Sequence, residues 1–229
     1  MEERPLFILV PLVYEAAFVA HALGFTLEKT QQSALGSFCT FADIRLHVIG
    51  PGAQALPDIG DNACAIVLAG LAGALDPSLQ IGNVLIDAEP KIFSNHPIFG
   101  SARAARFVHQ TRITGTARQK AELFRRTGAA AVDMESGPVR QLAARMGLPL
   151  IILRAISDTA DESLDPLIGT FVTPQGRTSL PRILLTLLRH PGLVFRLTSL
   201  QRSSVTAMAS LAEALTILLR EGLPQTVDQ

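Results

Sequence analysis

The stretch Leu148–Ile156, LPLIILRAI, decides the fold class of this 229-residue chain. It is apolar almost throughout, without the alternation of a strand that has one wet face. Such a strand is buried on both faces, as in a sheet covered by helices on each side. The other strands that we predict from short apolar runs are Leu6–Val10, Ala63–Ala69 and Val84–Asp87, with one or two more in Phe38–Val48.

Helices are expected between these strands. The predicted helices are Glu15–Leu23, Ala102–His109, Thr116–Arg126 and Pro138–Met146. Gly24 and Gly147 follow the first and the last of them, as helix-ending glycines do. Thr116–Arg126 is highly charged, so we expect it to be exposed. Strands alternating with helices predict an α/β fold of three layers with a single core.

Composition narrows the class of protein. Apolar residues make up 48% of the chain and charged residues 17%, which favours a folded core over disorder. Twenty basic and twenty acidic residues leave no net charge, so we expect no nucleic-acid partner. Cys39 and Cys64 are expected to be small core residues in a reducing compartment. The five histidines lack ligand spacing, and no apolar run reaches the roughly 18 residues of a membrane span. We expect a cytoplasmic protein without metal or cofactor.

The C-terminal region differs in charge from the rest. No acidic residue occurs between Asp165 and Glu213, while arginines recur among leucines at Arg177, Arg182, Arg189, Arg196 and Arg202. This pattern predicts two basic amphipathic helices, Leu180–Arg189 and Leu193–Gln201. We expect a catalytic core over residues 1–176, a helical extension over 177–221 packed on the same domain, and a flexible tail over 222–229.

Polar residues end the most apolar strand, in the segment Arg154-Ala155-Ile156-Ser157-Asp158. Ligands of open α/β sheets bind beyond the carboxyl ends of the strands. A carboxyl group that leaves a buried strand is partly desolvated, which favours its protonated form. Asp158 is therefore a candidate general acid, with Ser157 and Arg154 beside it. The alternative is that Asp158 and Ser157 only cap the next turn.

Two further carboxylates lie where helices are predicted to begin. In the segment Asp133-Met134-Glu135, a carboxylate could accept hydrogen bonds from both hydroxyls of a vicinal diol such as that of ribose, with Met134 packed on the sugar. Glu15 could orient or deprotonate a water molecule. The alternative for both is a favourable interaction with the helix dipole. Between two strands, Gly70-Leu71-Ala72-Gly73 predicts a turn whose glycines let backbone approach a ligand.

Together these residues resemble the nucleoside phosphorylase/nucleosidase superfamily, and especially the bacterial methylthioadenosine/S-adenosylhomocysteine nucleosidases. The resemblance is strongest over Ala131–Asp161, AVDMESGPVRQLAARMGLPLIILRAISDTAD. Weaker similarity covers Ile8–Val19, Ile49–Ala53 and Ile66–Ile86, so about two-thirds of the chain can be laid on the superfamily. It implies a three-layer phosphorylase/hydrolase-like fold, with a central mixed sheet that curls into a partial barrel flanked by helices. It also implies homo-oligomers with the site near an interface.

The resemblance assigns a role to each carboxylate. Asp158 matches the acid that protonates the purine, and Ser157 and Arg154 belong to the same motif. Glu135 matches the carboxylate that binds the ribose diol, beside Met134. Glu15 matches the glutamate that activates the attacking water. The implied reaction is cleavage of an N-glycosidic bond through an oxocarbenium-like transition state.

Three departures from the superfamily pattern affect this assignment. Leu71 stands where the Gly-Ser-Ala-Gly turn has serine. Neither Pro11–Tyr14 nor Val67–Ala69 supplies the arginine with which phosphorylases hold phosphate, which favours water as the nucleophile. The segment His109–Ala117 is shorter than the usual base-binding loop and lacks its aromatic residue, which leaves Arg118 and Phe107 as candidates.

Within the superfamily the chain is most similar to the hopanoid-associated phosphorylases, which share the VDMES motif, the short loop and an Arg/Leu-rich C-terminal extension. This subgroup implies adenine release from adenosylhopane, a lipid-linked nucleoside. Residues 177–221 would then touch the inner membrane at its periphery, or only pack on the core or a partner subunit. The alternatives are a methylthioadenosine/S-adenosylhomocysteine nucleosidase, a purine nucleoside phosphorylase that uses phosphate, and a non-catalytic protein that binds a nucleoside or lipid.

Overall fold

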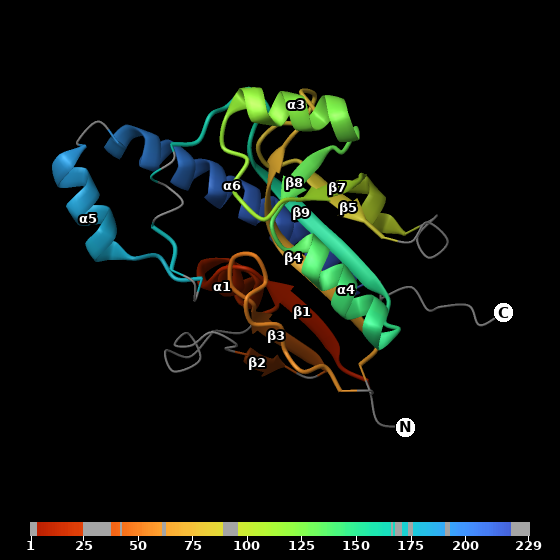
Figure 1. Ribbon diagram of the computed structural model, residues 1–229. Helices are drawn as coiled ribbons and strands as arrows, with labels where there is room; N and C mark the ends of the chain where they lie inside the picture. Colours follow the sequence, from red (N-terminus) through yellow and green to blue (C-terminus); the bar gives the residue numbers. More distant parts are fainter. Residues whose placement is uncertain are drawn as a thin grey trace.

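A mixed β-sheet forms the centre of the molecule (Figure 1). The computed structural model describes residues 4–24, 38–41, 43–60, 63–88, 96–165, 167, 171–173, 176–190 and 193–220. The strands in these residues are β1 (Leu6–Val10), β2 (Phe38–Phe41), β3 (Ile44–Val48), β4 (Ala65–Ala74), β5 (Val84–Asp87), β6 (Arg103–Ala104), β7 (Phe107–His109), β8 (Ala131–Asp133) and β9 (Leu150–Asp158). The helices are α1 (Val13–Ala22), α3 (Ala117–Thr127), α4 (Ser136–Met146), α5 (Leu180–Arg189) and α6 (Leu193–Arg220), with a 3₁₀ turn at Pro97–Gly100.

Strand β4 holds the sheet together. Along the main path the order is β2-β3-β1-β4-β9-β5-β6, and β4 lies parallel to both β1 and β9. A register shift at Ala72/Gly73 bends β4, and its last residues pair antiparallel with β8. The strand therefore belongs to two branches of the sheet, and β8 is brought beside the end of β9.

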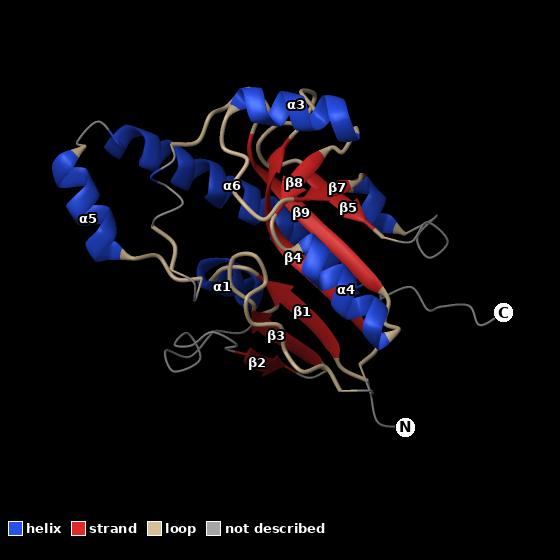
Figure 2. Ribbon diagram, in the orientation of Figure 1, coloured by secondary structure: helices blue, strands red, loops and turns tan. Residues whose placement is uncertain are grey.

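Helices cover both faces of the sheet (Figure 2). Alternate residues of one strand pack to opposite sides, since successive side chains of a strand point in opposite directions. Ile8 and Leu153 pack in a cluster with residues of α1 and α6, whereas Leu9 and Ile152 pack with residues of α4. This arrangement confirms the predicted α/β class with a mixed sheet flanked by helices.

The last helix is longer than the sequence predicts. Helix α6 runs to Arg220 rather than ending near Gln201, because its second half buries an apolar stripe against β9, β4 and α1. The fully buried members of this stripe are Ala207, Met208, Leu211, Ala214, Leu215 and Leu218. Helix α5 and the first turns of α6 extend away from the sheet (Figure 1). The predicted tail, 222–229, lies outside the described residues.

Two other predictions about the elements are wrong. The segment Ala102–His109 is not a helix but carries β6 and β7, because Phe107 and Val108 pair with β8 and Arg103 and Ala104 pair with β5. The glycine-containing segment Gly70–Gly73 is not a turn but the second half of β4, paired residue by residue with β9. Tertiary pairing overrides local propensity in both segments.

Candidate functional site

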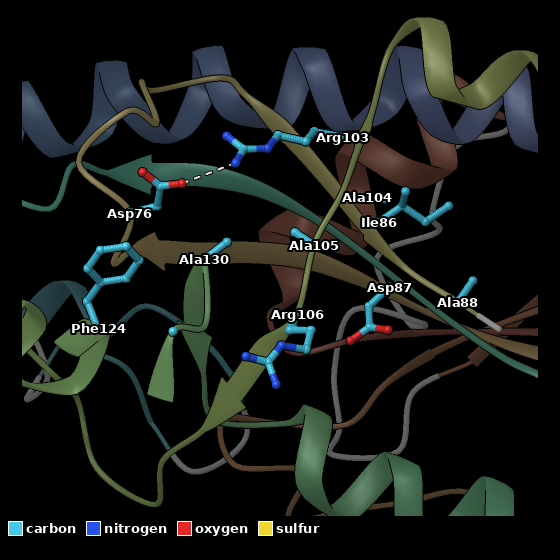
Figure 3. Close-up of a pocket in the computed structure, with 11 residues that line it drawn as sticks. Asp76, Ile86, Asp87, Ala88, Arg103, Ala104, Ala105, Arg106, Phe124 and Ala130 are labelled. Carbon is cyan, nitrogen blue, oxygen red and sulfur yellow. Dashed lines mark hydrogen bonds and ion pairs between the residues drawn. The ribbon is translucent and has the colours of Figure 1, made fainter. Parts of the chain in front are cut away.

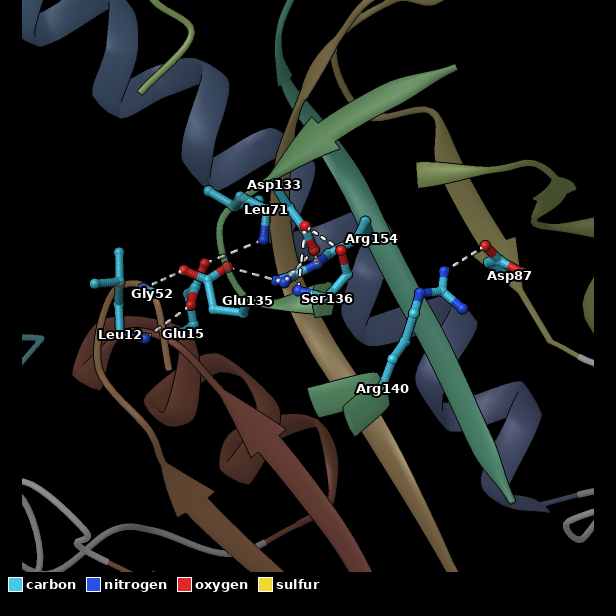
Figure 4. A network of polar contacts seen from close by, with 10 residues as sticks. All are labelled: Leu12, Glu15, Gly52, Leu71, Asp87, Asp133, Glu135, Ser136, Arg140 and Arg154. Atoms are coloured by element: carbon cyan, nitrogen blue, oxygen red, sulfur yellow. Dashed lines mark hydrogen bonds and ion pairs between the residues drawn. The ribbon is translucent and has the colours of Figure 1, made fainter. Parts of the chain in front are cut away.

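A fully buried arginine lies at the centre of the candidate site (Figure 4). Arg154, on β9, donates from Nε and Nη2 to Oδ2 of Asp133, at 3.1 and 2.7 Å. The same Nη2 donates to Oε2 of Glu135 at 2.9 Å. Asp133 ends β8 and Glu135 is the N-cap residue directly before α4, so one guanidinium on β9 joins three elements. Burial opposes the charge of Arg154, but the carboxylates of Asp133, Glu135 and Glu15 together raise its pKa.

Glu15 is the third carboxyl group of this cluster. Its side chain is buried on α1, where Oε2 accepts the backbone N–H of Leu12 at 2.9 Å and Oε1 that of Leu71 at 3.1 Å. Burial raises the pKa of Glu15 to about 7, against the opposing charge of Arg154, and the nearby Glu135 raises it further. Glu15 can therefore exchange a proton near neutral pH, as a general base must.

Glu135 keeps capacity for a ligand. Its Oε1 accepts the backbone N–H of Gly52 at 2.9 Å, and its Oε2 accepts from Arg154. Each carboxylate oxygen can accept a second hydrogen bond, so the two oxygens can receive both hydroxyls of a diol. Burial raises the pKa of Glu135; Arg154 opposes the rise and Asp133 adds to it.

Gly70 leaves room for the guanidinium. A Cβ atom at this position would lie 2.5 Å from Nη1 of Arg154 and 3.3 Å from Oε1 of Glu15. That Nη1 is buried and makes no hydrogen bond to a residue that the structure describes. One unused donor and one carboxylate oxygen thus lie close to the glycine.

Asp158 lies in a second polar group at the end of β9. It is 5% exposed, and its Oδ1 accepts from the hydroxyl of Ser157 at 2.7 Å. Its Oδ2 accepts from Nζ of Lys120 at 2.6 Å. Burial of Asp158 was expected from the sequence, but its buried cation was not. Lys120 belongs to the helix predicted to be exposed, and its burial shows that prediction to be wrong at this position.

The candidate residues therefore fall into two groups. Glu15, Glu135, Arg154 and the backbone of Gly70 and Leu71 form one. The second contains Ser157 and Asp158, with Gly73 close enough that an added Cβ would lie 3.0 Å from Oδ2 of Asp158. Met134 is part-exposed next to Glu135.

Sequence reasoning missed three contributors. Asp133, Gly52 and Lys120 carry hydrogen bonds of the two groups but had no assigned role. Lys120 lies one turn before Leu123, which is buried on the same face of α3. That i, i+3 spacing is the one sequence signal for its burial.

The two residues named as candidates for base recognition lie elsewhere. Phe107, on β7, packs against core clusters on both of its sides. Arg118 is exposed on α3. Leu71 contributes its backbone N–H to Glu15, and its part-exposed side chain packs against the core cluster that contains residues of α1 and α6.

A separate hollow lies between β5, β6 and α3 (Figure 3). It has a volume of about 480 Å³ and contains none of the candidate residues. Its charged side chains already have partners: Arg103 binds Asp76, Arg106 binds the carbonyl of Thr127, and Asp87 binds Arg140. Within the described ranges, no group of three or more His, Cys, Asp or Glu side chains could hold a metal ion.

Comparison with known proteins identifies the fold. The fold is that of the nucleoside phosphorylases and nucleosidases. The family described as the phosphorylase superfamily matches residues 101–189, which include Lys120, Glu135, Arg154 and Asp158. No curated protein matches the chain.

Three solved structures illustrate the similarity in fold. A 5'-methylthioadenosine/S-adenosylhomocysteine nucleosidase from Helicobacter pylori has a TM-score of 0.65 at 15% identity, covering 96% of this chain and 100% of its own. The corresponding nucleosidase from Colwellia psychrerythraea, in complex with adenine, has a TM-score of 0.63 at 14% identity, covering 99% of each chain. The futalosine hydrolase of Helicobacter pylori has a TM-score of 0.60 at 13% identity, covering 96% and 98%.

Replacement of Gly70 should disturb the cluster. In Gly70→Ala the new methyl group would overlap Nη1 of the buried Arg154, so we expect the free energy of unfolding to fall by about 1–3 kcal/mol. Urea denaturation of the wild type and the variant measures this difference. Gly100→Ala is the matched control, because a Cβ at Gly100 meets nothing within 4 Å. Equal stability of the two variants would show that Arg154 is not held against Gly70.

Proposed function

We propose that this chain is an enzyme that cleaves the N-glycosidic bond of a purine nucleoside. The observation that carries the proposal is the buried Arg154 cluster at the carboxyl side of the central strands, together with Asp158 further along the same strand. The ribose diol would bind Glu135, with Met134 beside the sugar, and the base would lie toward Asp158. Asp158, oriented by Ser157, would donate the proton that makes the purine a better leaving group.

Water is the nucleophile that the cluster favours. Glu15, with its pKa near 7, can accept a proton from a water molecule, and Nη1 of Arg154 can donate a hydrogen bond to the same oxygen. A phosphate dianion would have to enter beside the carboxyl groups of Glu15, Glu135 and Asp133, which a single guanidinium compensates. The negative charges of these carboxyl groups repel the phosphate and oppose its binding.

For the substrate, we propose an adenine nucleoside joined to a polycyclic lipid, adenosylhopane. The sequence resemblance to the hopanoid-associated phosphorylases supports this choice, and so do the exposed apolar side chains on the projecting helices. Phe195 is 80% exposed, and Leu185, Val194 and Val205 are also exposed. Arg189, Arg196 and Arg202 are exposed on the same two helices, which favours contact with an anionic membrane. No described helix is long and apolar enough to cross a bilayer.

Adenine release tests the activity directly. We expect the wild type to release adenine from adenosylhopane at a rate independent of added phosphate, and Asp158→Asn to lower kcat by about 100-fold or more, the effect of losing a general acid. Chromatographic assay of adenine, with methylthioadenosine as the soluble comparison, measures both. Release from methylthioadenosine alone would indicate an ordinary nucleosidase. Binding of both nucleosides without release would indicate a non-catalytic binding protein.

The pH dependence of kcat/KM tests Glu15. A base must be ionised to act, and the pKa of Glu15 lies near 7, so we expect kcat/KM to fall by about tenfold per pH unit below that value. The Glu135→Gln variant should keep this acid limb, although burial also raises the pKa of Glu135. An acid limb that is lost in Glu135→Gln and kept in Glu15→Gln would reverse the assignment.

Vesicle binding tests the proposed membrane surface. We expect Phe195→Ser to weaken binding to vesicles of anionic phospholipid, measured by co-sedimentation, about tenfold or more, because burial of one aromatic side chain contributes about 1.5–3 kcal/mol. Phe99→Ser, at an exposed phenylalanine on the 3₁₀ turn Pro97–Gly100 rather than on α5 or α6, should bind as the wild type does. Unchanged vesicle binding of Phe195→Ser, with a lower association state by light scattering, would identify a subunit interface instead.

A further inference from the structure

A buried ion pair joins α3 to the end of β9. The side chain of Lys120 is fully buried, and its Nζ donates to Oδ2 of Asp158 at 2.6 Å. It also donates to the carbonyl oxygens of Thr159 at 2.6 Å and Glu162 at 3.0 Å. An ammonium group has three donors, so Lys120 uses all of them on the strand end and the turn that follows it.

Other contacts fix the same two segments to each other. The N-terminus of α3 is capped by Thr116, whose hydroxyl accepts the backbone N–H of Gln119. The backbone N–H of Ala117 donates to the hydroxyl of Ser163 at 3.0 Å, and that of Leu164 donates to the carbonyl of Gly115 at 2.7 Å. Lys120 is thus held in place by more than its own ion pair.

The positive charge of Lys120 is buried, which is unfavourable without a compensating partner. A buried ammonium loses its hydration, which costs several kcal/mol before its partners compensate it. A neutral donor such as an amide could anchor the carbonyls of Thr159 and Glu162 without that cost. The one partner that requires a cation is the carboxyl group of Asp158.

The carboxyl group of Asp158 is held on both oxygens. Ser157 donates to Oδ1 and Lys120 to Oδ2, so rotation of the group is restricted. Of the acids near this pair, Glu162 contributes its backbone carbonyl, and Asp161 accepts from the hydroxyl of Thr159 and is exposed. Lys120 is therefore the charged group that acts on Asp158 at contact distance among the residues described.

We propose that Lys120 is a positioning residue for base release, an inference that rests on the proposed function. For base release Asp158 must first take up a proton from solvent. When that proton passes to the purine, the C–N bond breaks and the carboxylate of Asp158 forms its ion pair with Lys120 again. The ammonium of Lys120 lies against that carboxylate and stabilises the charge as it forms. It also keeps the carboxyl group turned toward the base.

The test combines two substitutions in a cycle. Lys120→Met removes the charge at similar length, and we expect it to lower kcat for adenine release from adenosylhopane or methylthioadenosine, whichever the wild type cleaves, by about tenfold or more. In the Asp158→Asn background the same change should add less than about a twofold loss, because the two residues act as one unit. The loss should fall on kcat with KM little changed, because the ammonium group of Lys120 contacts only Asp158, Thr159 and Glu162 among the residues described.

Two controls separate this role from a structural one. Arg125→Met changes an exposed cation on α3 and should leave kcat and KM unchanged. If Lys120→Met does not fold by circular dichroism, Lys120→Gln, which keeps hydrogen-bond donors without the charge, takes its place in the cycle. The double variant lacks both charges, so it retains no unpaired buried ion.

The outcomes are distinguishable. Losses that multiply in the double variant, together with a rise in KM in place of a fall in kcat, would overturn the role of Lys120 while adenine release stands. A wild-type protein that releases adenine from neither nucleoside would overturn the proposed function, and the role of Lys120 would fall with it.

Discussion

The ion pair of Arg154 with Asp133, and its extension to Glu135 and Glu15, is the interaction on which the rest of the site depends. A buried guanidinium is stable only if carboxylates surround it with good geometry, and here they come from β8, α4 and α1. One cation faces three acids, so the cluster cannot hold every carboxyl group ionised at no cost. Burial together with this imbalance accounts for the pKa of about 7 at Glu15. The same constraint explains Gly70, because any side chain there would occupy the space of the guanidinium.

A second charged pair, Asp158 with Lys120, lies further along β9, so the strand carries two separate parts of the proposed site. Arg154 organises the side where sugar and water would bind, and Asp158 with Lys120 forms the side where the base would leave. The two pairs lie four residues apart, about 13 Å along an extended strand. Solved nucleosidases share this fold at 13–15% identity, which establishes the architecture of the chain. The proposed chemistry therefore rests on Glu15, Glu135 and Asp158 and their partners rather than on overall similarity.

The sequence predicts the features that local patterns encode. The apolar run of β9 marks a buried central strand, and the adjacent polar residues lie where an α/β sheet binds ligands. Other features depend on contacts between distant segments. From the sequence, Lys120 is predicted to be an exposed residue of a charged helix. Its burial is stable only because acceptors at the end of β9 bind its ammonium group. Ala102–His109 has helical composition but pairs with β5 and β8. Gly70–Gly73 resembles a turn until β9 extends alongside it.

The most direct test of this account is a crystal structure of the Asp158→Asn variant with methylthioadenosine bound. We predict that the two ribose hydroxyls lie within hydrogen-bond distance of Glu135, that the purine N7 faces residue 158, and that a water molecule lies between Glu15 and Nη1 of Arg154. A nucleoside bound instead in the hollow beside Arg103 and Phe124, with the Arg154 cluster unoccupied, would contradict the account.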